Sequence, residues 1–130
     1  MDGQTLNEST VFDSKIDGTM GMLSTYRYAA TNTTFKGPSY LGKILARFME
    51  IMGIEMAKYN KLYFVFVILT DGNIHDMDEV KRLMIKMSYL PVSLIIVGIG
   101  SEDFEDMNSL DADTKVLTDS DGRQAARDIC

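Results

Sequence analysis

Two side chains with oxygen atoms stand where they could hold a hard metal cation. Asp71 follows the apolar run Leu62–Leu69 and precedes Gly72, and Ser39 stands between a Gly-Pro pair and a helical pattern. Carboxylate and hydroxyl oxygens are suitable ligands for Mg²⁺ and Ca²⁺. Ligands of open parallel sheets bind beyond the carboxyl ends of the strands, so Ser39 and Asp71 could share one metal site at such an edge.

Each of these two residues also has a purely structural interpretation. Ser39 directly precedes a helical pattern, where a hydroxyl commonly accepts a hydrogen bond from the first turn and caps the helix. Asp71 could stabilise its own turn through its side chain. From these local patterns alone, the structural and the metal-binding interpretations both remain open.

Catalytic groups do not form a recognisable set. His75 is the only histidine and hence the only ordinary candidate base, and no G-x-S-x-G motif accompanies it. Cys130 is the only cysteine, so neither an internal disulfide nor a zinc cluster can be built on it. No phosphate-binding loop of the Walker or G-x-G-x-x-G type is present. We therefore expect a protein that is not an enzyme, with no catalytic residues.

Composition and charge exclude some classes of partner and of cellular location. The 130 residues carry 13 Lys and Arg against 19 Asp and Glu, a net charge of −6, which is the wrong sign for nucleic-acid binding. The longest apolar runs are far shorter than the roughly 20 residues that span a bilayer. The first residues lack the basic and apolar parts of a signal peptide, so a cytoplasmic location is expected.

Apolar periodicity predicts the elements that must position Ser39 and Asp71. Helices are expected over Asp17–Ala30, Leu41–Tyr59 and Met77–Met87, with strands over Leu62–Leu69 and Val92–Val97. The strand patterns are apolar without alternation, which is typical of parallel strands covered on both faces. A strand, a helix and a second strand in this order predict a βαβ unit.

Shorter patterns complete the expected elements. Asp76 and Glu79 have the spacing of a capping box for the helix that begins at Met77. Glu102–Leu110 suggests a short helix, Lys115–Leu117 a short strand and Arg123–Asp128 a last helical turn. Two long strands leave unpaired edges, so we expect marginal stability or a tendency to aggregate.

Several of these stretches together resemble one known family. Tyr63–Gly72, Leu90–Gly100 and Ala125–Ile129 closely resemble the von Willebrand factor A-like (vWA) domain of copines, and Lys36–Tyr40 is similar to its Gly-Pro-Thr segment. The resemblance covers Ile16–Ile129. It implies an α/β fold with a Rossmann-like, doubly wound, mainly parallel sheet. We expect residues 1–15 to be a polar segment and residues 16–130 to be part of such a domain, without its first strands.

The resemblance also implies a metal-ion-dependent adhesion site. Asp71 matches the family's aspartate after a later strand, and Ser39 occupies the position of its threonine. The Asp-x-Ser-x-Ser motif has no counterpart, because in the nearest string Lys15 replaces a hydroxyl and lies in the wrong place. The site therefore looks incomplete. Copines further carry C2 domains that bind phospholipid in a calcium-dependent way, and this chain contains none of that sequence.

The function implied is that of a non-catalytic protein-interaction module. A partner protein would contact the carboxyl edge of the sheet at Ser39, Asp71 and Asn73–Asp76. The family resemblance also implies a location at the inner face of the plasma membrane, where the chain would contact the membrane only indirectly. One alternative is the vWA-like part of a RING-type ubiquitin ligase, which would need a Cys/His-rich zinc module. Another is a Mg²⁺-dependent hydrolase that uses Asp71, which would need further carboxylates or a lysine at other strand ends.

The incomplete site leads to a prediction about metal binding. A hard divalent cation takes about six oxygen ligands, whereas Ser39 and Asp71 supply only two side chains. We expect weak or no binding of Mg²⁺ or Ca²⁺ in a calorimetric titration. A micromolar affinity that Asp71→Ala abolishes would contradict this expectation.

Overall fold

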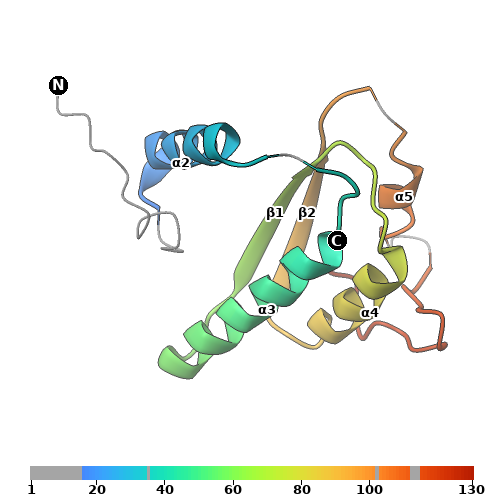
Figure 1. The fold of residues 1–130 in the computed structure, drawn as a ribbon. Coiled ribbons are helices and arrows are strands. Elements are labelled where there is room, and N and C mark those ends of the chain that lie inside the picture. The colour runs from blue at the N-terminus through green and yellow to red at the C-terminus, as the bar shows by residue number, and fades with distance from the viewer. Residues whose placement is uncertain (1–15, 35, 102, 112–114) are drawn as a thin grey trace, which may run out of the picture. The chain divides into compact units, whose positions relative to one another are not determined.

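The computed structural model describes residues 16–34, 36–101, 103–111 and 115–130. Its elements are, in order, α2 (Gly18–Asn32), α3 (Leu41–Lys58), β1 (Phe64–Thr70), α4 (Met77–Met87), β2 (Val92–Gly98) and α5 (Glu105–Asn108) (Figure 1). The chain divides into two compact units, Met1–Gly37 and Pro38–Cys130, each described here by itself. Within the described residues, no helix combines the length and the apolar character that a membrane crossing requires.

The first unit contributes α2 as its described element. None of its residues is fully buried. Two side chains of the last turn bond to backbone carbonyls, Thr31 Oγ1 to Arg27 at 2.8 Å and Asn32 Nδ2 to Tyr28 at 2.8 Å. Asp17 stands at the N-cap, as predicted, but its side chain makes no capping hydrogen bond.

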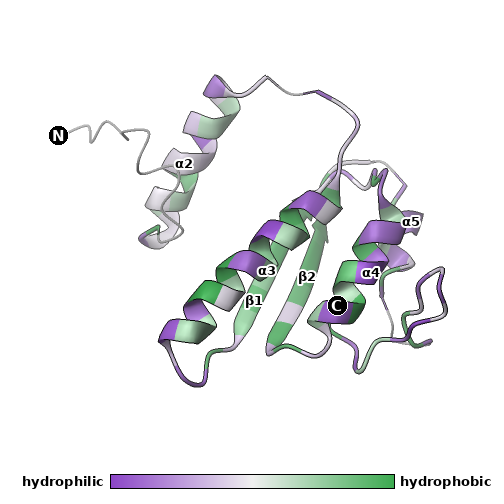
Figure 2. Ribbon diagram, turned by 60° about the horizontal axis from the view of Figure 1, so that its bottom comes forward, coloured by the Kyte–Doolittle hydropathy of each residue, from purple (hydrophilic) through white to green (hydrophobic). Residues whose placement is uncertain are grey.

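The second unit is built on two parallel strands. β1 and β2 pair in the register that runs from Phe64 opposite Val92 to Thr70 opposite Gly98. The chain leaves β1 through α4 and returns in β2, so the predicted strand, helix and strand are confirmed. Figures 1 and 2 show α3 and α4 lying side by side over the same face of the two strands. The molecule therefore has the predicted mixed α/β character, with a small parallel sheet.

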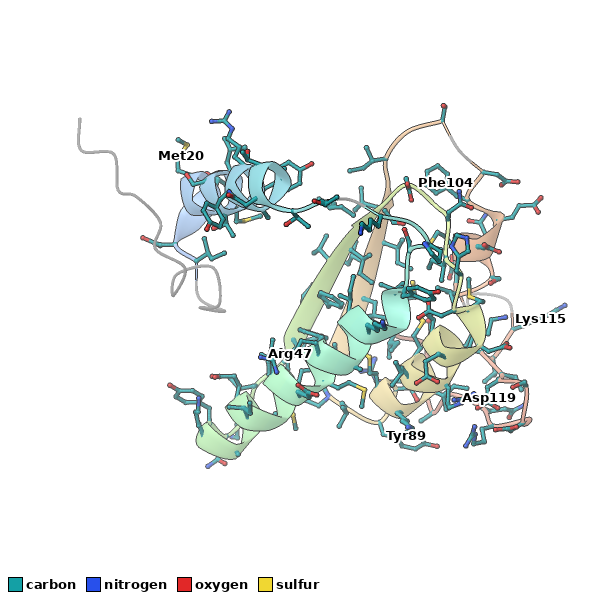
Figure 3. All side chains as sticks on the ribbon, in the orientation of Figure 1. Met20, Arg47, Tyr89, Phe104, Lys115 and Asp119 are labelled. Atoms are coloured by element: carbon teal, nitrogen blue, oxygen red, sulfur yellow. The ribbon has the colours of Figure 1, made fainter. Side chains whose placement is uncertain are left out.

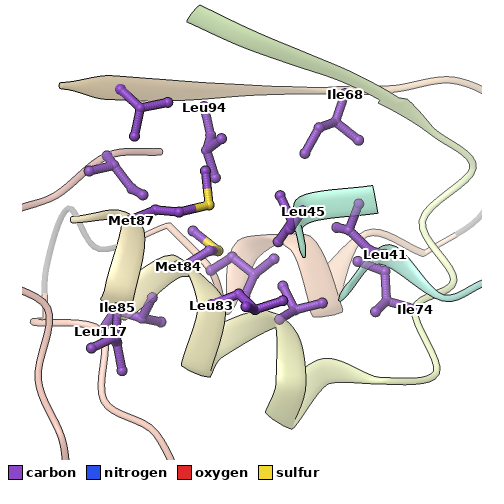
Figure 4. Packing of buried hydrophobic residues seen from close by; sticks show 14 of the residues in the cluster. Leu41, Leu45, Ile68, Ile74, Leu83, Met84, Ile85, Met87, Leu94 and Leu117 are labelled. Atoms are coloured by element: carbon purple, nitrogen blue, oxygen red, sulfur yellow. The ribbon is translucent and has the colours of Figure 1, made fainter. Parts of the chain in front are cut away.

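The core lies between α3, α4 and one face of the sheet. Leu45, Met84, Met87 and Leu94 are almost completely buried, and Figure 4 shows their side chains gathered beneath the strands. The Phe48 ring of α3 stacks on Phe66 of β1 with 4.1 Å between the ring centroids. Long-range packing of this kind, and not intrinsic helix propensity, supplies most of the stability of helices of this length.

The opposite face of the sheet differs from the prediction. Side chains of a strand alternate between faces, and those of Val65, Leu69 and Ile95 point away from α3 and α4, with 58%, 64% and 48% of their surface exposed. The expectation of strands covered on both faces is therefore wrong for the described part of the second unit. The apolar run correctly indicated two apolar faces, but it carries no information on which element covers each of them.

Two of the predicted short elements near the C-terminus are also absent. In place of a strand over Lys115–Leu117 and a helical turn over Arg123–Asp128, the described residues form one antiparallel bridge between Thr118 and Gln124. Patterns of three to six residues are too short for periodicity to distinguish a strand, a helix and a turn.

A buried carboxylate organises this C-terminal turn. Asp119 accepts hydrogen bonds from the backbone of Asp121 at 3.0 Å and of Arg123 at 2.9 Å, and from Arg123 Nε at 2.7 Å. Burial by itself raises the pKa of the Asp119 carboxyl, but the hydrogen bonds and the positive charge of Arg123 outweigh it, so the pKa lies below its ordinary value. The carboxylate thus stays ionised and holds the turn closed.

At the carboxyl ends of the strands, a single ring packs against two glycines. A Cβ on Gly98 would lie 2.6, 2.8 and 2.9 Å from three ring carbons of Phe104, and one on Gly72 would lie 2.8 Å from the carbonyl oxygen of Asp103. Gly72 also has a φ of +103°, which favours glycine. Figure 3 shows Phe104 beside the ends of the strands. Close packing here therefore depends on the missing Cβ atoms.

This contact predicts the effect of a small substitution. Gly98→Ala should lower the free energy of unfolding by about 1–3 kcal/mol, because the new methyl group must displace the Phe104 ring. Urea unfolding followed by circular dichroism measures the change. The matched control is Gly53→Ala in α3, where nothing lies within 4 Å of the added Cβ and where alanine should stabilise the helix by about 0.5–1 kcal/mol. A neutral Gly98→Ala would contradict the prediction.

Candidate functional site

The loops that carry Ser39 and Asp71 meet at the carboxyl edge of the sheet. Asp71 directly follows β1, and Ser39 lies shortly before α3. The His75 backbone N–H, in the loop after β1, donates to the carbonyl oxygen of Ser39 at 3.1 Å. The expectation that these two loops share one edge is therefore supported by a direct backbone contact, although it joins Ser39 to His75 and not to Asp71.

Asp76 makes the second and stronger link between these loops. Its carboxylate oxygens accept hydrogen bonds from the backbone N–H groups of Leu41 at 3.0 Å and Gly42 at 2.9 Å. These donors are among the first N–H groups of α3, which have no partner within the helix. A carboxylate at this end is also stabilised by the helix dipole. Asp76 thus caps α3 from a position 34 residues further along the chain.

Two predictions about capping are consequently wrong. The N-cap of α3 is Tyr40, which makes no side-chain capping bond, so Ser39 does not cap this helix. Asp76 does stand at the N-cap of α4, but its side chain does not bond to α4. Glu79 pairs instead with Arg82 at 2.6 Å. The spacing of Asp76 and Glu79 predicts hydrogen bonds within α4. The Asp76 carboxylate instead accepts hydrogen bonds from the first N–H groups of α3, which have no partner within their own helix.

Gly42 is the sequence signal that could have revealed this arrangement. A Cβ at this position would lie 2.7 Å from Asp76 Oδ2 and 3.0 Å from Glu79 Cγ. A glycine in the first turn of a helix weakens that helix by about 1 kcal/mol relative to alanine, so close approach of another chain segment is a physical reason for its presence. The two helix N-termini could not meet here if residue 42 had a side chain.

The turn after β1 is held without help from Asp71. The Gly72 N–H donates to Thr70 Oγ1 at 3.1 Å, and the Ile99 N–H donates to the Thr70 carbonyl oxygen at 2.8 Å. Among the described residues, the side chain of Asp71 has no hydrogen-bond partner, and it is exposed. The structural interpretation of Asp71 as a turn stabiliser is therefore wrong, and its carboxylate remains available to solvent or to a ligand.

The residues at this edge do not fit a complete divalent-metal site. Asp71 offers one carboxylate and Ser39 one hydroxyl, while the Asp76 carboxylate is occupied by two N–H donors. Across the described ranges, no three His, Cys, Asp or Glu side chains are grouped so that they could hold a metal ion. A hard cation that takes about six oxygens would have to draw most of them from water.

Cys130 is not suited to be a nucleophile. Burial raises the pKa of its thiol to about 11, and the negative charges of Asp111 and Asp128 add to the shift. The thiol therefore remains protonated at neutral pH, and only a thiolate is strongly nucleophilic. Its environment favours a packing role.

The role of Asp76 can be tested by mutation. Asp76→Ala removes the acceptor of two backbone N–H groups and should lower the free energy of unfolding by about 1–3 kcal/mol. Asp78→Ala is the matched control, because Asp78 is an exposed acidic residue in the first turn of α4 and should cost only about 0.3–1 kcal/mol through the helix dipole. Urea unfolding compares the two, and equal losses would show that the link to α3 contributes nothing.

Comparison with known proteins identifies relatives of this chain by sequence. The family model described as Copine matches residues 2–130. Similar proteins include BONZAI 1 of Arabidopsis thaliana, 38% identical over 125 residues, or 95% of this chain and 22% of that protein. Copine-C of Dictyostelium discoideum is 37% identical over 112 residues, covering 86% of this chain and 21% of its own length.

A nematode protein adds a further relative. Nicotinic receptor-associated protein 1 of Caenorhabditis elegans is 40% identical over 119 residues, which is 89% of this chain and 18% of that protein. The chain thus spans about a fifth of the length of the curated relatives that it matches. Because the family model covers nearly the whole sequence, this chain belongs to the copine family.

Proposed function

We propose that this chain is a non-catalytic protein-interaction module with a vWA-like fold, whose partner contacts the carboxyl edge of the sheet. The observation that carries the proposal is the construction of that edge. Asp76 and the bond from His75 to Ser39 hold its two loops together, while the side chains of Ser39, Asp71 and His75 remain exposed.

An edge whose loops are joined by hydrogen bonds and whose side chains are exposed suits recognition. A partner that binds preformed loops does not have to order them, which saves much of the entropy cost of association. Exposed polar residues on loops held by a scaffold are also common binding positions in proteins. The carboxyl edge therefore combines a fixed backbone with side chains free to contact another molecule.

The fold assignment rests on the parallel pair and its crossover. β1, α4 and β2 form the repeating unit of a doubly wound sheet, and both faces of the two strands carry apolar side chains. Together with membership of the copine family, this arrangement supports our assignment of residues 16–130 to a vWA-like domain.

A protein partner is favoured over a substrate. The nematode relative is named for its association with a nicotinic receptor, which supports a partner of the protein class for this family member. In the described parts of the chain, the only histidine is exposed and the only cysteine is protonated at neutral pH. We further propose a cytoplasmic location, with contact to the plasma membrane made only through other molecules.

Substitution at the edge tests the proposed function. The paired variant Asp71→Ala and His75→Ala removes two exposed side chains without touching the bonds of Asp76, so the fold should persist. Glu50→Ala, on an exposed part of α3, is the matched control. The 130-residue chain and its variants are compared by quantitative affinity purification, and the strongest captured protein is then titrated in purified form.

We expect a direct partner whose affinity falls by about tenfold or more in the paired variant, as for a recognition surface with energetically important residues. Its affinity for the Glu50→Ala variant should be unchanged. If every partner binds the paired variant as tightly as the unchanged chain, the carboxyl edge is not the contact surface.

A further inference from the structure

Tyr40, the N-cap residue of α3, combines a fixed backbone with an exposed side chain. On one side of it, the His75 N–H donates to the carbonyl oxygen of Ser39 at 3.1 Å. On the other side, the Asp76 carboxylate accepts the N–H of Leu41 at 3.0 Å. Both neighbours of Tyr40 are therefore tied to the loop after β1. The Tyr40 side chain itself makes no capping bond, and 46% of the residue is exposed.

The Tyr40 ring carries a positive charge on its face. Lys43 Nζ lies 5.2 Å from the ring centroid, and a cation within about 6 Å of an aromatic face is attracted to it. The ion pairs of α3 among the described residues involve Arg47 and Lys58, and none involves Lys43. The Lys43 ammonium is thus held against the ring of Tyr40 and has no carboxylate partner within the described part of the chain.

The charges around this pair restrict the chemistry of a ligand. Residues 38–49 contain Lys43 and Arg47 but no Asp or Glu. Asp71 and Asp78 are exposed on the loop after β1 and in the first turn of α4, and the chain carries a net charge of −6. A run of acidic residues would therefore be repelled. A single carboxylate close to Lys43 would be attracted, because salt screens exposed charges that lie further away than about 10 Å.

The same pair also offers apolar contact. A tyrosine presents a large, rigid surface that loses little conformational entropy on binding, and tyrosine is enriched among the residues that dominate binding energy. The bonds on both sides of Tyr40 and the contact with Lys43 position this surface before a partner arrives, which lowers the cost of association. A complementary segment therefore places an apolar side chain on the Tyr40 ring and a carboxylate beside Lys43.

We propose that Tyr40 and Lys43 are the anchor of the carboxyl edge and bind a partner-protein segment in which one Asp or Glu stands beside apolar residues. The carboxylate pairs with the Lys43 ammonium, and the apolar neighbour packs against the exposed part of the Tyr40 ring. This inference names the chemistry of the partner of the interaction surface, so it rests on the proposed function.

The first test uses a peptide with one Glu between two Leu residues in a Gly-Ser background. Two-dimensional NMR spectra of the isotope-labelled 130-residue chain are recorded as this peptide is added to millimolar concentration. We expect the amide signals of Tyr40 and Lys43 to shift. A control peptide with Gln in place of Glu should bind about two- to fivefold more weakly, the range of an exposed ion pair. Equal affinities, or unchanged signals at both residues, would overturn the proposal.

Substitutions at the pair locate the site on the protein. Tyr40→Ala should abolish the shifts, Tyr40→Phe should retain them because the ring remains, and Lys43→Gln should weaken binding by about two- to fivefold. Tyr59→Ala is the matched control for the ring, because Tyr59 is 52% exposed at the other end of α3. Lys86→Gln is the control for the charge, because Lys86 is exposed in the last turn of α4. Equal losses in the variants and their controls would overturn the proposal.

The direct partner found in the test of the proposed function separates the two proposals. Its affinity should fall by about tenfold or more in Tyr40→Ala. A partner that loses affinity for the Asp71 and His75 variant, but binds Tyr40→Ala and Lys43→Gln unchanged, would overturn this inference and leave the proposed function standing. If no partner depends on Asp71 and His75, the proposed function fails, and the peptide titration still decides whether Tyr40 and Lys43 bind a carboxylate-bearing segment.

Discussion

The carboxylate of Asp76 connects the parts of this molecule that local sequence leaves separate. It ends the loop after β1 and begins α4, yet it satisfies the first N–H groups of α3. Since those groups would otherwise lose hydrogen bonds on burial, the carboxylate determines where α3 starts and how closely it approaches α4. Both helices then lie over one face of the sheet, and the core between them follows from that placement. Gly42 is the steric condition for the whole contact.

Close packing that requires glycine also shapes the carboxyl ends of the strands. Phe104 packs where Gly72 and Gly98 leave room for its ring, so the segment after β2 lies against the turn after β1. This packing and the bonds of Thr70 shape the turn, and they leave the side chain of Asp71 exposed. The candidate interaction edge thus results from close backbone packing. The backbone groups of its loops are buried or hydrogen-bonded, whereas the exposed side chains are available to a partner.

Periodicity in the sequence was sufficient for the main elements. The apolar spacing of Leu41, Leu45 and Met52 predicted α3, and the apolar runs before Asp71 and Gly98 predicted β1 and β2, because burial of one face requires a regular spacing of apolar residues. The same evidence could not assign Asp76 to α3, since a hydrogen bond over 34 residues leaves no local pattern. It also failed for the C-terminal turn, where hydrogen bonds to Asp119 outweigh weak propensities.

The sequence by itself determined the α/β character, the order of helices and strands, and membership of the copine family, because these depend on residue types and their spacing along the chain. Only the tertiary structure decided which face of the sheet is covered and which helix Asp76 caps. Each of these is a competition between groups distant in sequence for the same hydrogen-bond donor or the same apolar surface. Such a competition is settled by proximity in space, which a one-dimensional pattern does not contain.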